Sequence, residues 1–139
     1  MSSCAQHDDR SISNAQLVDN MTDAVTPDQS VLELGKVAMF PWDSLLILNP
    51  FSNLDVLSAK LHVDLSEAKQ SGIDQRDDID LLIFFSNGQH VRMVEYPRIS
   101  GDFIDTTVRF IVRDSAQFKI VETNRLNMAG HKWIELRRR

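Results

Sequence analysis

Two apolar segments joined by a short turn constrain the fold of this chain more than any other feature. The segments Ile79–Phe85 and His90–Tyr96 flank the sequence Ser-Asn-Gly-Gln at positions 86–89. An Asn-Gly pair tolerates the positive φ angles that tight hairpins require, so the segments are predicted to pair as antiparallel strands. Every residue of Leu81–Phe85 is apolar, which indicates a central strand that is covered on both faces of its sheet.

Two helices and several further strands are predicted around this hairpin. Ser13–Val25 carries apolar residues at helical spacing, and a second helix is expected to begin after Ser52 or Asn53. Ser30–Val37 fits either a short strand or one helical turn, which Gly35 would end in both cases. The other predicted strands are Asp43–Leu48, Thr106–Arg113, Gln117–Glu122 and Lys132–Leu136.

The length of 139 residues is that of one domain, and 42% hydrophobic residues supply one core. We predict an α+β fold with a mostly antiparallel sheet of five or six strands, one helix packed on a face, and an N-terminal helix. The N-terminal helix, or a second protomer in a homodimer, is expected to cover the second face of Leu81–Phe85. Residues 1–12 are predicted to be a disordered polar tether and residues 13–139 the single domain.

Charge is divided unevenly along the chain. Residues 1–80 hold 14 Asp and Glu against 5 Lys and Arg, whereas residues 81–139 hold 6 against 10. Solvated acidic and basic faces are the simplest explanation, and a basic surface that meets an acidic partner is the alternative. The net charge of −5 argues against general nucleic-acid binding, which typically uses a basic domain.

Cys4 is the only cysteine, so no disulfide within the chain is expected. Ser2-Ser3-Cys4 precedes a polar stretch and resembles the end of a bacterial lipoprotein signal, in which a small residue precedes the cysteine that receives the lipid. Such a signal also has a basic and an apolar segment upstream of the cysteine, and only three residues precede Cys4 here. Lipidation of Cys4 in a precursor and an incidental cytosolic cysteine are the two interpretations.

No metal or cofactor site is predicted. Asp74, Asp77, Asp78 and Asp80 crowd one segment, and carboxylate oxygens are ligands for hard cations. Their spacing lacks the glycine and the terminal glutamate of a calcium-binding loop, so a solvated acidic loop is expected. The five glycines are isolated turn positions rather than a phosphate-binding loop.

No catalytic residue is predicted either, although two places have suitable side chains. His62 and Asp64 would share one side of an extended segment, where the carboxylate could orient the imidazole. Glu95 and Asp102 are a second carboxylate pair with the right chemistry for acid–base work. The simpler expectations are a surface histidine and ion pairs of both carboxylates with Arg98.

The predicted ligand or partner surface consists of Trp42, Arg92, Arg109 and Arg113. Arg109 and Arg113 would share one face of a predicted strand and give the sheet a basic edge. Arginine on an outward strand face also protects a sheet from aggregation, which is the alternative explanation. Trp42 is expected to anchor the core, although a tryptophan in a concave site also stacks on ligands.

Part of the chain resembles small uncharacterised bacterial lipoproteins and secreted proteins. The resemblance is carried by Phe-Pro-Trp-Asp at 40–43, the apolar Leu45–Leu48, Asn-Pro-Phe-Ser at 49–52, Leu81–Phe85 and Arg-Ile-Ser-Gly-Asp-Phe at 98–103. It covers about residues 39–103 and implies an envelope location, in agreement with lipidation of Cys4. It brings no established activity.

The leading functional prediction is a non-enzymatic envelope lipoprotein, a binding or accessory module for a protein partner or small ligand. It would touch a membrane only through the lipid on Cys4, and would bind neither nucleic acid nor a cofactor. The alternative is a cytosolic interaction protein, such as an immunity-type inhibitor, whose acidic N-terminal half binds a basic partner. An enzyme with acid–base chemistry at His62, Asp64 or Glu95 is the third interpretation.

Overall fold

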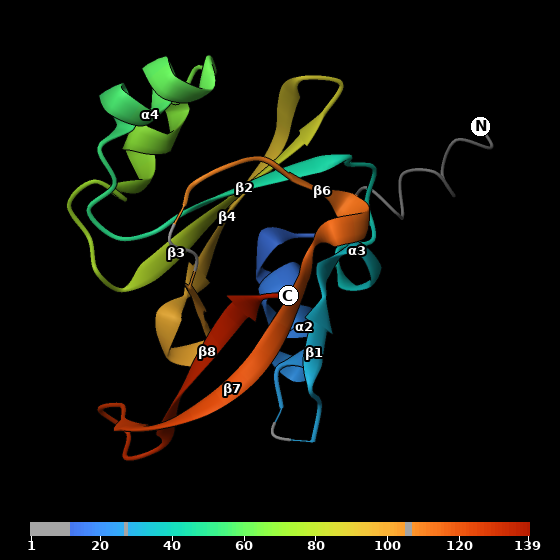
Figure 1. The fold of residues 1–139 in the computed structure, drawn as a ribbon, viewed down its shortest axis with the longest axis vertical. Coiled ribbons are helices and arrows are strands. Elements are labelled where there is room, and N and C mark those ends of the chain that lie inside the picture. Colours follow the sequence, from blue (N-terminus) through green and yellow to red (C-terminus); the bar gives the residue numbers. More distant parts are fainter. Residues whose placement is uncertain (1–11, 27, 105–106) are drawn as a thin grey trace.

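The computed structural model describes residues 12–26, 28–104 and 107–139 (Figure 1). The helices are α2 (Asn14–Ala24), α3 (Leu34–Val37) and α4 (Leu54–Leu61), and the 3-10 turns are η1 (Glu67–Ser71), η2 (Arg98–Ser100) and η3 (Arg113–Ser115). The strands are β1 (Val31–Glu33), β2 (Ser44–Leu48), β3 (Ile79–Ser86), β4 (Gln89–Pro97), β5 (Asp102–Ile104), β6 (Ile111–Val112), β7 (Gln117–Leu126) and β8 (Lys132–Arg138).

The strands form two four-stranded sheets, in the orders β1-β7-β8-β5 and β4-β3-β2-β6. Neighbouring strands are antiparallel except β5 and β8, which are parallel. The α+β class is therefore confirmed, whereas the predicted single sheet of five or six strands differs from the observed pair of sheets. β5 was not predicted, and β1 was predicted only as one of two alternatives. Each has three residues, which is too short to show the alternation that reveals a strand in sequence.

The predicted hairpin of β3 and β4 is confirmed. Asn87 and Gly88 have φ angles of 52° and 81°, the left-handed conformations that a two-residue hairpin turn requires. The residues Ile79–Phe85 of β3 are all buried. β3 pairs with β2 on one edge and β4 on the other, so it lies in the centre of its sheet as predicted.

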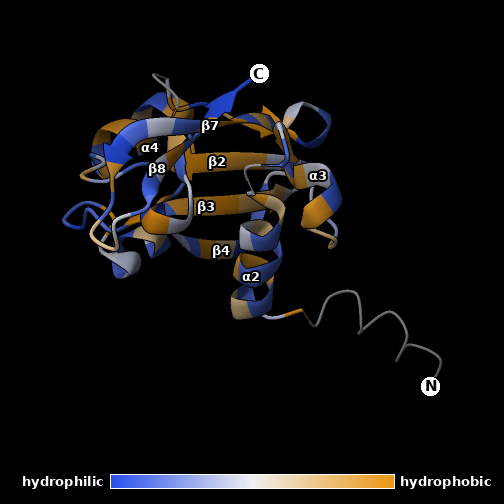
Figure 2. Cartoon of the chain, turned by 90° about the horizontal axis from the view of Figure 1, so that it is seen from below, coloured by the Kyte–Doolittle hydropathy of each residue, from blue (hydrophilic) through white to orange (hydrophobic). Residues whose placement is uncertain are grey.

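Each face of β3 contributes to a separate core. Leu82 and Phe84 pack into the layer between the two sheets, where α2 adds Leu17 and Met21. Figure 2 shows α2 beside the apolar strands β2, β3 and β4. The alternating residues Leu81, Ile83 and Phe85 pack on the opposite face, which α4 and η1 cover. Elements of a single chain thus cover both faces of β3. A second protomer is not needed for this purpose, and the homodimer stays a prediction.

The two predicted helices form with the expected caps. The Ser13 hydroxyl accepts a hydrogen bond from the Gln16 amide at the start of α2, and the Asn53 side chain accepts one from the Val56 amide at the start of α4. Such side-chain acceptors satisfy amides that have no partner inside the helix. α4 ends at His62, whose φ of 55° is left-handed.

Two predicted segments differ from the structure. Val31–Glu33 forms β1 and Leu34–Val37 forms α3, so both alternatives for this segment occur in succession and Gly35 does not end the helical turn. In the predicted strand at 106–113, the described part forms a strand only at Ile111–Val112. These two residues pair with Leu45 and Ser44 of β2, and the ladder extends no further. Thr106 lies outside the described residues.

Candidate functional site

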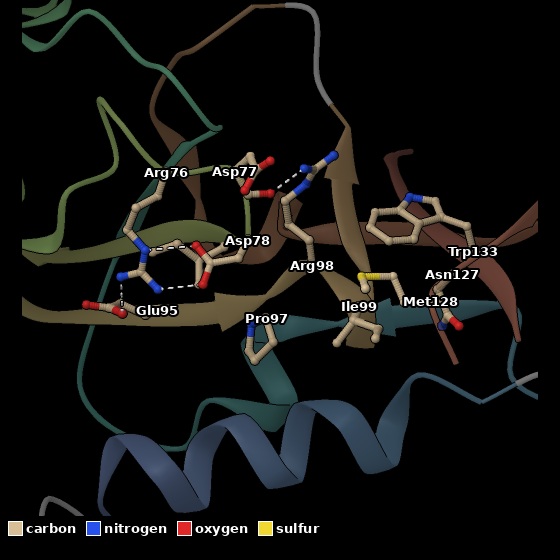
Figure 3. Close-up of a pocket in the computed structure, with 11 residues that line it drawn as sticks. Arg76, Asp77, Asp78, Glu95, Pro97, Arg98, Ile99, Asn127, Met128 and Trp133 are labelled. Carbon is tan, nitrogen blue, oxygen red and sulfur yellow. Dashed lines mark hydrogen bonds and ion pairs between the residues drawn. The ribbon is translucent and has the colours of Figure 1, made fainter. Parts of the chain in front are cut away.

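A cavity of about 660 Å³ opens between the ends of β3 and β4 and the turn that joins β7 to β8 (Figure 3). It is lined by Arg76, Asp77, Asp78, Ile79, Glu95, Pro97, Arg98, Ile99, Asn127, Met128 and Trp133. Its wall thus combines residues of both sheets. Its volume lies in the range of small-molecule and side-chain sites.

The apolar part of this cavity is exposed to solvent. Ile99 of η2 is 52% exposed, and Met128 in the β7–β8 turn is fully exposed. Trp133 of β8 is partly buried, and its indole Nε1 has no hydrogen-bond partner among the described residues. Large apolar side chains that gather at a cavity and stay in water indicate a binding surface, because their burial by a ligand is favourable.

One side of the cavity is fixed by Arg76. Its guanidinium donates to both carboxylate oxygens of Asp78 at 2.8 Å, to Glu95 Oε1 at 2.9 Å and to the Ser71 carbonyl at 3.0 Å. The hydrogen bond from Arg76 lowers the pKa of Asp78, and the bonds to Asp78 and then Glu95 raise the pKa of Arg76. Asp78 therefore remains ionised beside the Arg76 guanidinium, which also holds Glu95 in an ion pair.

Arg98 forms the wall between this charged side and Trp133 (Figure 3). Its Nε and Nη2 atoms donate to the two carboxylate oxygens of Asp102 at 3.0 and 2.9 Å, and Nη1 donates to the Asp77 carbonyl at 2.6 Å. The guanidinium carbon lies 5.3 Å from the centre of the Trp133 ring. A two-pronged bond to a carboxylate fixes orientation as well as distance, so the position of Arg98 depends on Asp102.

Behind Arg98 lies a buried pair of carboxyl groups. Asp80 of β3 is fully buried and Asp102 of β5 is 3% exposed. Asp80 accepts hydrogen bonds from the Asn49 side chain at 3.0 Å and from the amide of Phe103, the residue after Asp102, at 2.8 Å. The Asp102 carboxyl lies near enough to raise the pKa of Asp80. Because the two aspartates belong to different sheets, this pair joins the sheets at the cavity.

The pair retains one proton at neutral pH. Burial, followed by the hydrogen bond to Asp102 and its negative charge, raises the pKa of Asp80 from 3.8 to about 8. A hydrogen bond between two carboxyl groups needs a proton, and two adjacent buried carboxylates repel each other. We therefore assign the proton to Asp80, whereas Asp102 forms the ion pair with Arg98.

The observed carboxyl pair differs from the one considered in the sequence. Asp102 does pair with Arg98 as expected, but Glu95 pairs with Arg76 instead. Asp102 instead lies beside Asp80, which was predicted to belong to a solvated acidic loop. The available signal was its position directly before Leu81–Phe85, because a charged residue at the start of a fully buried strand needs a partner.

Trp42 and Arg113 of the predicted partner surface contact each other inside the fold. Trp42 is 4% exposed and donates from Nε1 to the Ala38 carbonyl at 3.0 Å. The Arg113 guanidinium lies 4.9 Å from the Trp42 ring. It donates to the carbonyls of Gly35 (2.7 and 3.2 Å), Phe40 (2.9 Å), Ala38 (3.2 Å) and Trp42 (3.4 Å). Both residues therefore stabilise the junction of α3, β2 and η3.

The other two residues of that surface belong to other segments than Trp42 and Arg113. Arg92 of β4 donates to the Ile12 carbonyl at 2.5 Å and lies 4.5 Å from the Phe40 ring centre. Arg109 is exposed and precedes β6, whereas Arg113 follows it in η3, so they do not share a strand face. The predicted lipidation site, Cys4, lies outside the described residues.

Neither His62 and Asp64, the first acid–base pair considered, nor His90 lines the cavity. His90 Nε2 lies 3.0 Å from Glu67 Oε2. Asp64 accepts a hydrogen bond from the Ser66 amide at 2.9 Å, which lowers the pKa of Asp64, and His62 is exposed at the end of α4. Over the described residues, no group of three His, Cys, Asp or Glu side chains is placed to hold a metal ion.

Comparisons of the chain with protein families, with curated proteins and with solved structures found no match. In the part of the chain that the structure describes, no helix is both long and apolar enough to cross a membrane. The chain's own geometry is thus the basis for a function, and the cavity lined by Trp133 brings exposed apolar side chains and ordered charges together.

Proposed function

We propose that the protein is a non-enzymatic binding module whose partner inserts an apolar side chain into the cavity beside Trp133. The observation that carries this proposal is the exposure of Ile99 and Met128 at a cavity whose two arginines are held by ion pairs. Prearranged polar groups around an apolar pocket lower the cost of ordering the site upon binding.

The charges at the cavity favour a basic partner. Asp77, Asp78 and Glu95 line it together with two arginines. One of these arginines, Arg98, is already paired with Asp102 from behind. The exposed carboxylate of Asp77 forms no ion pair among the described residues, although its charge acts on Arg98. A peptide segment with an apolar residue next to Lys or Arg would bury the apolar side chain in the cavity. Its basic side chain would then lie near Asp77.

This proposal is tested with short peptides in which leucine is next to either arginine or glutamate. Binding is followed by NMR of methyl-labelled methionine, since Met128 lies at the cavity and Met39, also exposed, does not line it. We expect the arginine peptide to shift the Met128 signal, to leave Met39 unchanged and to bind about tenfold more tightly than the glutamate peptide. Equal binding of both peptides, or a response at Met39 alone, would reject the proposed site.

We also propose that the module works at the cell envelope, held by a lipid on Cys4. Support comes from Ser2-Ser3-Cys4 and from the resemblance of residues 39–103 to bacterial lipoproteins. Labelled palmitate should enter the protein when its genomic upstream sequence is present and should be lost in Cys4→Ala. Absence of label from the wild type would favour the cytosolic interaction protein, whose acidic half includes Asp77 and Asp78.

A further inference from the structure

We propose that the buried pair Asp80–Asp102 is a proton switch that sets the position of Arg98 against Trp133 and thereby makes the cavity sensitive to pH. The consequence for binding rests on the proposed function of the cavity. The structural change itself is a property of the free protein and can be measured without a partner.

The switch is a continuous series of contacts from the joint between the sheets to the cavity. Asp80 of β3 accepts a hydrogen bond at 2.8 Å from the amide of Phe103, the residue that follows Asp102 in β5, and both aspartates are buried there. Asp102 accepts two hydrogen bonds from Arg98 of η2 at 2.9 and 3.0 Å, and the Arg98 guanidinium lies 5.3 Å from the ring of Trp133 of β8. Arg98 and Trp133 both line the cavity.

Among the described residues, the cation that forms an ion pair with one of the two aspartates is Arg98. Arg98 is the cation in contact with Asp102, and Asp77 lies on the far side of Arg98. On β4, the residue opposite Asp80 is Tyr96, whose hydroxyl lies 3.2 Å from that of Thr22. On β8, the residue opposite Asp102 is Glu135, which pairs with Arg137. One guanidinium balances one carboxylate, so the second carboxyl stays neutral.

Loss of the proton from Asp80 changes this balance. With the proton present, Asp80 donates to Asp102, and Asp102 directs both oxygens to Arg98. Without it, two carboxylates face each other in a site closed to solvent, and their repulsion is not screened by water. Asp102 lies in a strand of three residues and Arg98 in a turn of three residues. We expect both to move relative to β3, which shifts Arg98 against Trp133.

The test is an NMR titration of the full chain with labelled aspartate carboxyl, methionine methyl and tryptophan indole groups. A carboxyl signal should titrate near pH 8, the value of about 8 for Asp80, and the Trp133 and Met128 signals should move with the same midpoint. Met39 should not follow. His131, which lies in the β7–β8 turn, is replaced in all samples by His131→Gln, because imidazoles titrate in the neutral range.

Two variants decide the result. Asp80→Asn removes the titrating group and should abolish the transition at Trp133 and Met128. Asp78→Asn removes a carboxylate from the same cavity but leaves the pair intact, so the transition should persist. The proposal is overturned if the cavity signals titrate with the same midpoint in Asp80→Asn, or if no buried carboxyl of the wild type titrates in this range. The carboxyl titration of the wild type decides the matter even if Asp80→Asn fails to fold.

Binding gives a separate readout. If the arginine peptide binds at about pH 6, its affinity should fall by about tenfold at about pH 9 in the wild type and remain unchanged in Asp80→Asn. No binding at the lower pH would reject the proposed function and leave the titration standing. Binding that is independent of pH, together with immobile cavity signals, would reject the switch and leave the proposed function standing.

Discussion

Arg98 and Arg113 are both partly buried arginines beside a tryptophan, yet they are held by different chemistry. Arg113 donates to four backbone carbonyls and lies 4.9 Å from the buried Trp42 ring. Arg98 donates to the carboxylate of Asp102 and lies 5.3 Å from Trp133 at an open cavity. The first arrangement contains no acid, and the second depends on a pair of acids.

This difference separates a structural junction from a regulated one. Backbone carbonyls do not titrate, so the contacts of Arg113 are independent of pH. The carboxyl pair behind Arg98 titrates, because burial and the neighbouring Asp102 raise the pKa of Asp80 to about 8. A chain that needed only to join its sheets could use apolar residues at this position, since buried polar clusters of this kind are often no more stabilising than apolar packing.

The largest effect is expected from the loss of Arg113. Arg113→Ala removes a donor from the Gly35, Phe40 and Trp42 carbonyls, whereas the Ala38 carbonyl keeps the Trp42 indole. A buried acceptor without a partner costs about 1–3 kcal/mol. We expect the free energy of unfolding in urea to fall by about 3–5 kcal/mol. The control is Arg109→Ala at an exposed position, with a change within about 0.5 kcal/mol. Similar losses in both variants would remove the distinction between the two arginines.

The second effect is a pH dependence of stability that comes from Asp80. Its pKa is raised from 3.8 to about 8 in the folded chain, so the native state holds the proton more tightly than the unfolded chain. The resulting stabilisation is complete below about pH 4 and is lost as the pH rises through about 8. Urea unfolding of the wild type should lose about 2–4 kcal/mol across this range.

The matched variant for this effect is Asp80→Asn, which keeps a polar side chain at the position but has no proton to lose. Its unfolding free energy should change less over the same pH range, and above about pH 8 it should exceed that of the wild type. Parallel pH curves for the two proteins would show that the stability difference does not arise from Asp80. Arg113→Ala should keep the pH dependence of the wild type, which isolates the acid pair as its source.

A smaller effect, on the pKa itself, is expected from Arg98→Ala. The guanidinium stabilises the ionised form of Asp102 at 2.9 Å, so its removal leaves the pair with a negative charge and no cation in contact. The midpoint of the buried carboxyl titration should therefore rise by about one unit. A midpoint that stays in place or falls would mean that Arg98 does not control the pair, and that the cavity and the acids are independent.

Local sequence patterns were enough to predict the central hairpin but not the acid pair. The apolar Leu81–Phe85 and the Asn87-Gly88 turn identified the central hairpin, because each signal lies within a few residues. The acid pair depends instead on contacts across 22 positions, and on the pairing of β5 with β8 in a second sheet. No periodicity marks a strand of three residues. Asp80 and Asp102 could be recognised as candidates, but their contact could not be derived.

The smallest effect on stability should come from the exposed apolar residues, and it separates binding from folding. Met128 is fully exposed in the β7–β8 turn, so Met128→Ser should change the free energy of unfolding by less than about 0.5 kcal/mol. The same variant should weaken binding of the arginine peptide by about tenfold, because a truncated anchor at a cavity costs more than about 1 kcal/mol. Met39→Ser, at a position 63% exposed and outside the cavity, should leave both quantities unchanged.

If Met128→Ser lowers the free energy of unfolding as well, the Met128 side chain stabilises the β7–β8 turn. A cavity that gains its apolar lining from a residue without a structural role is the arrangement expected of a surface kept for a partner.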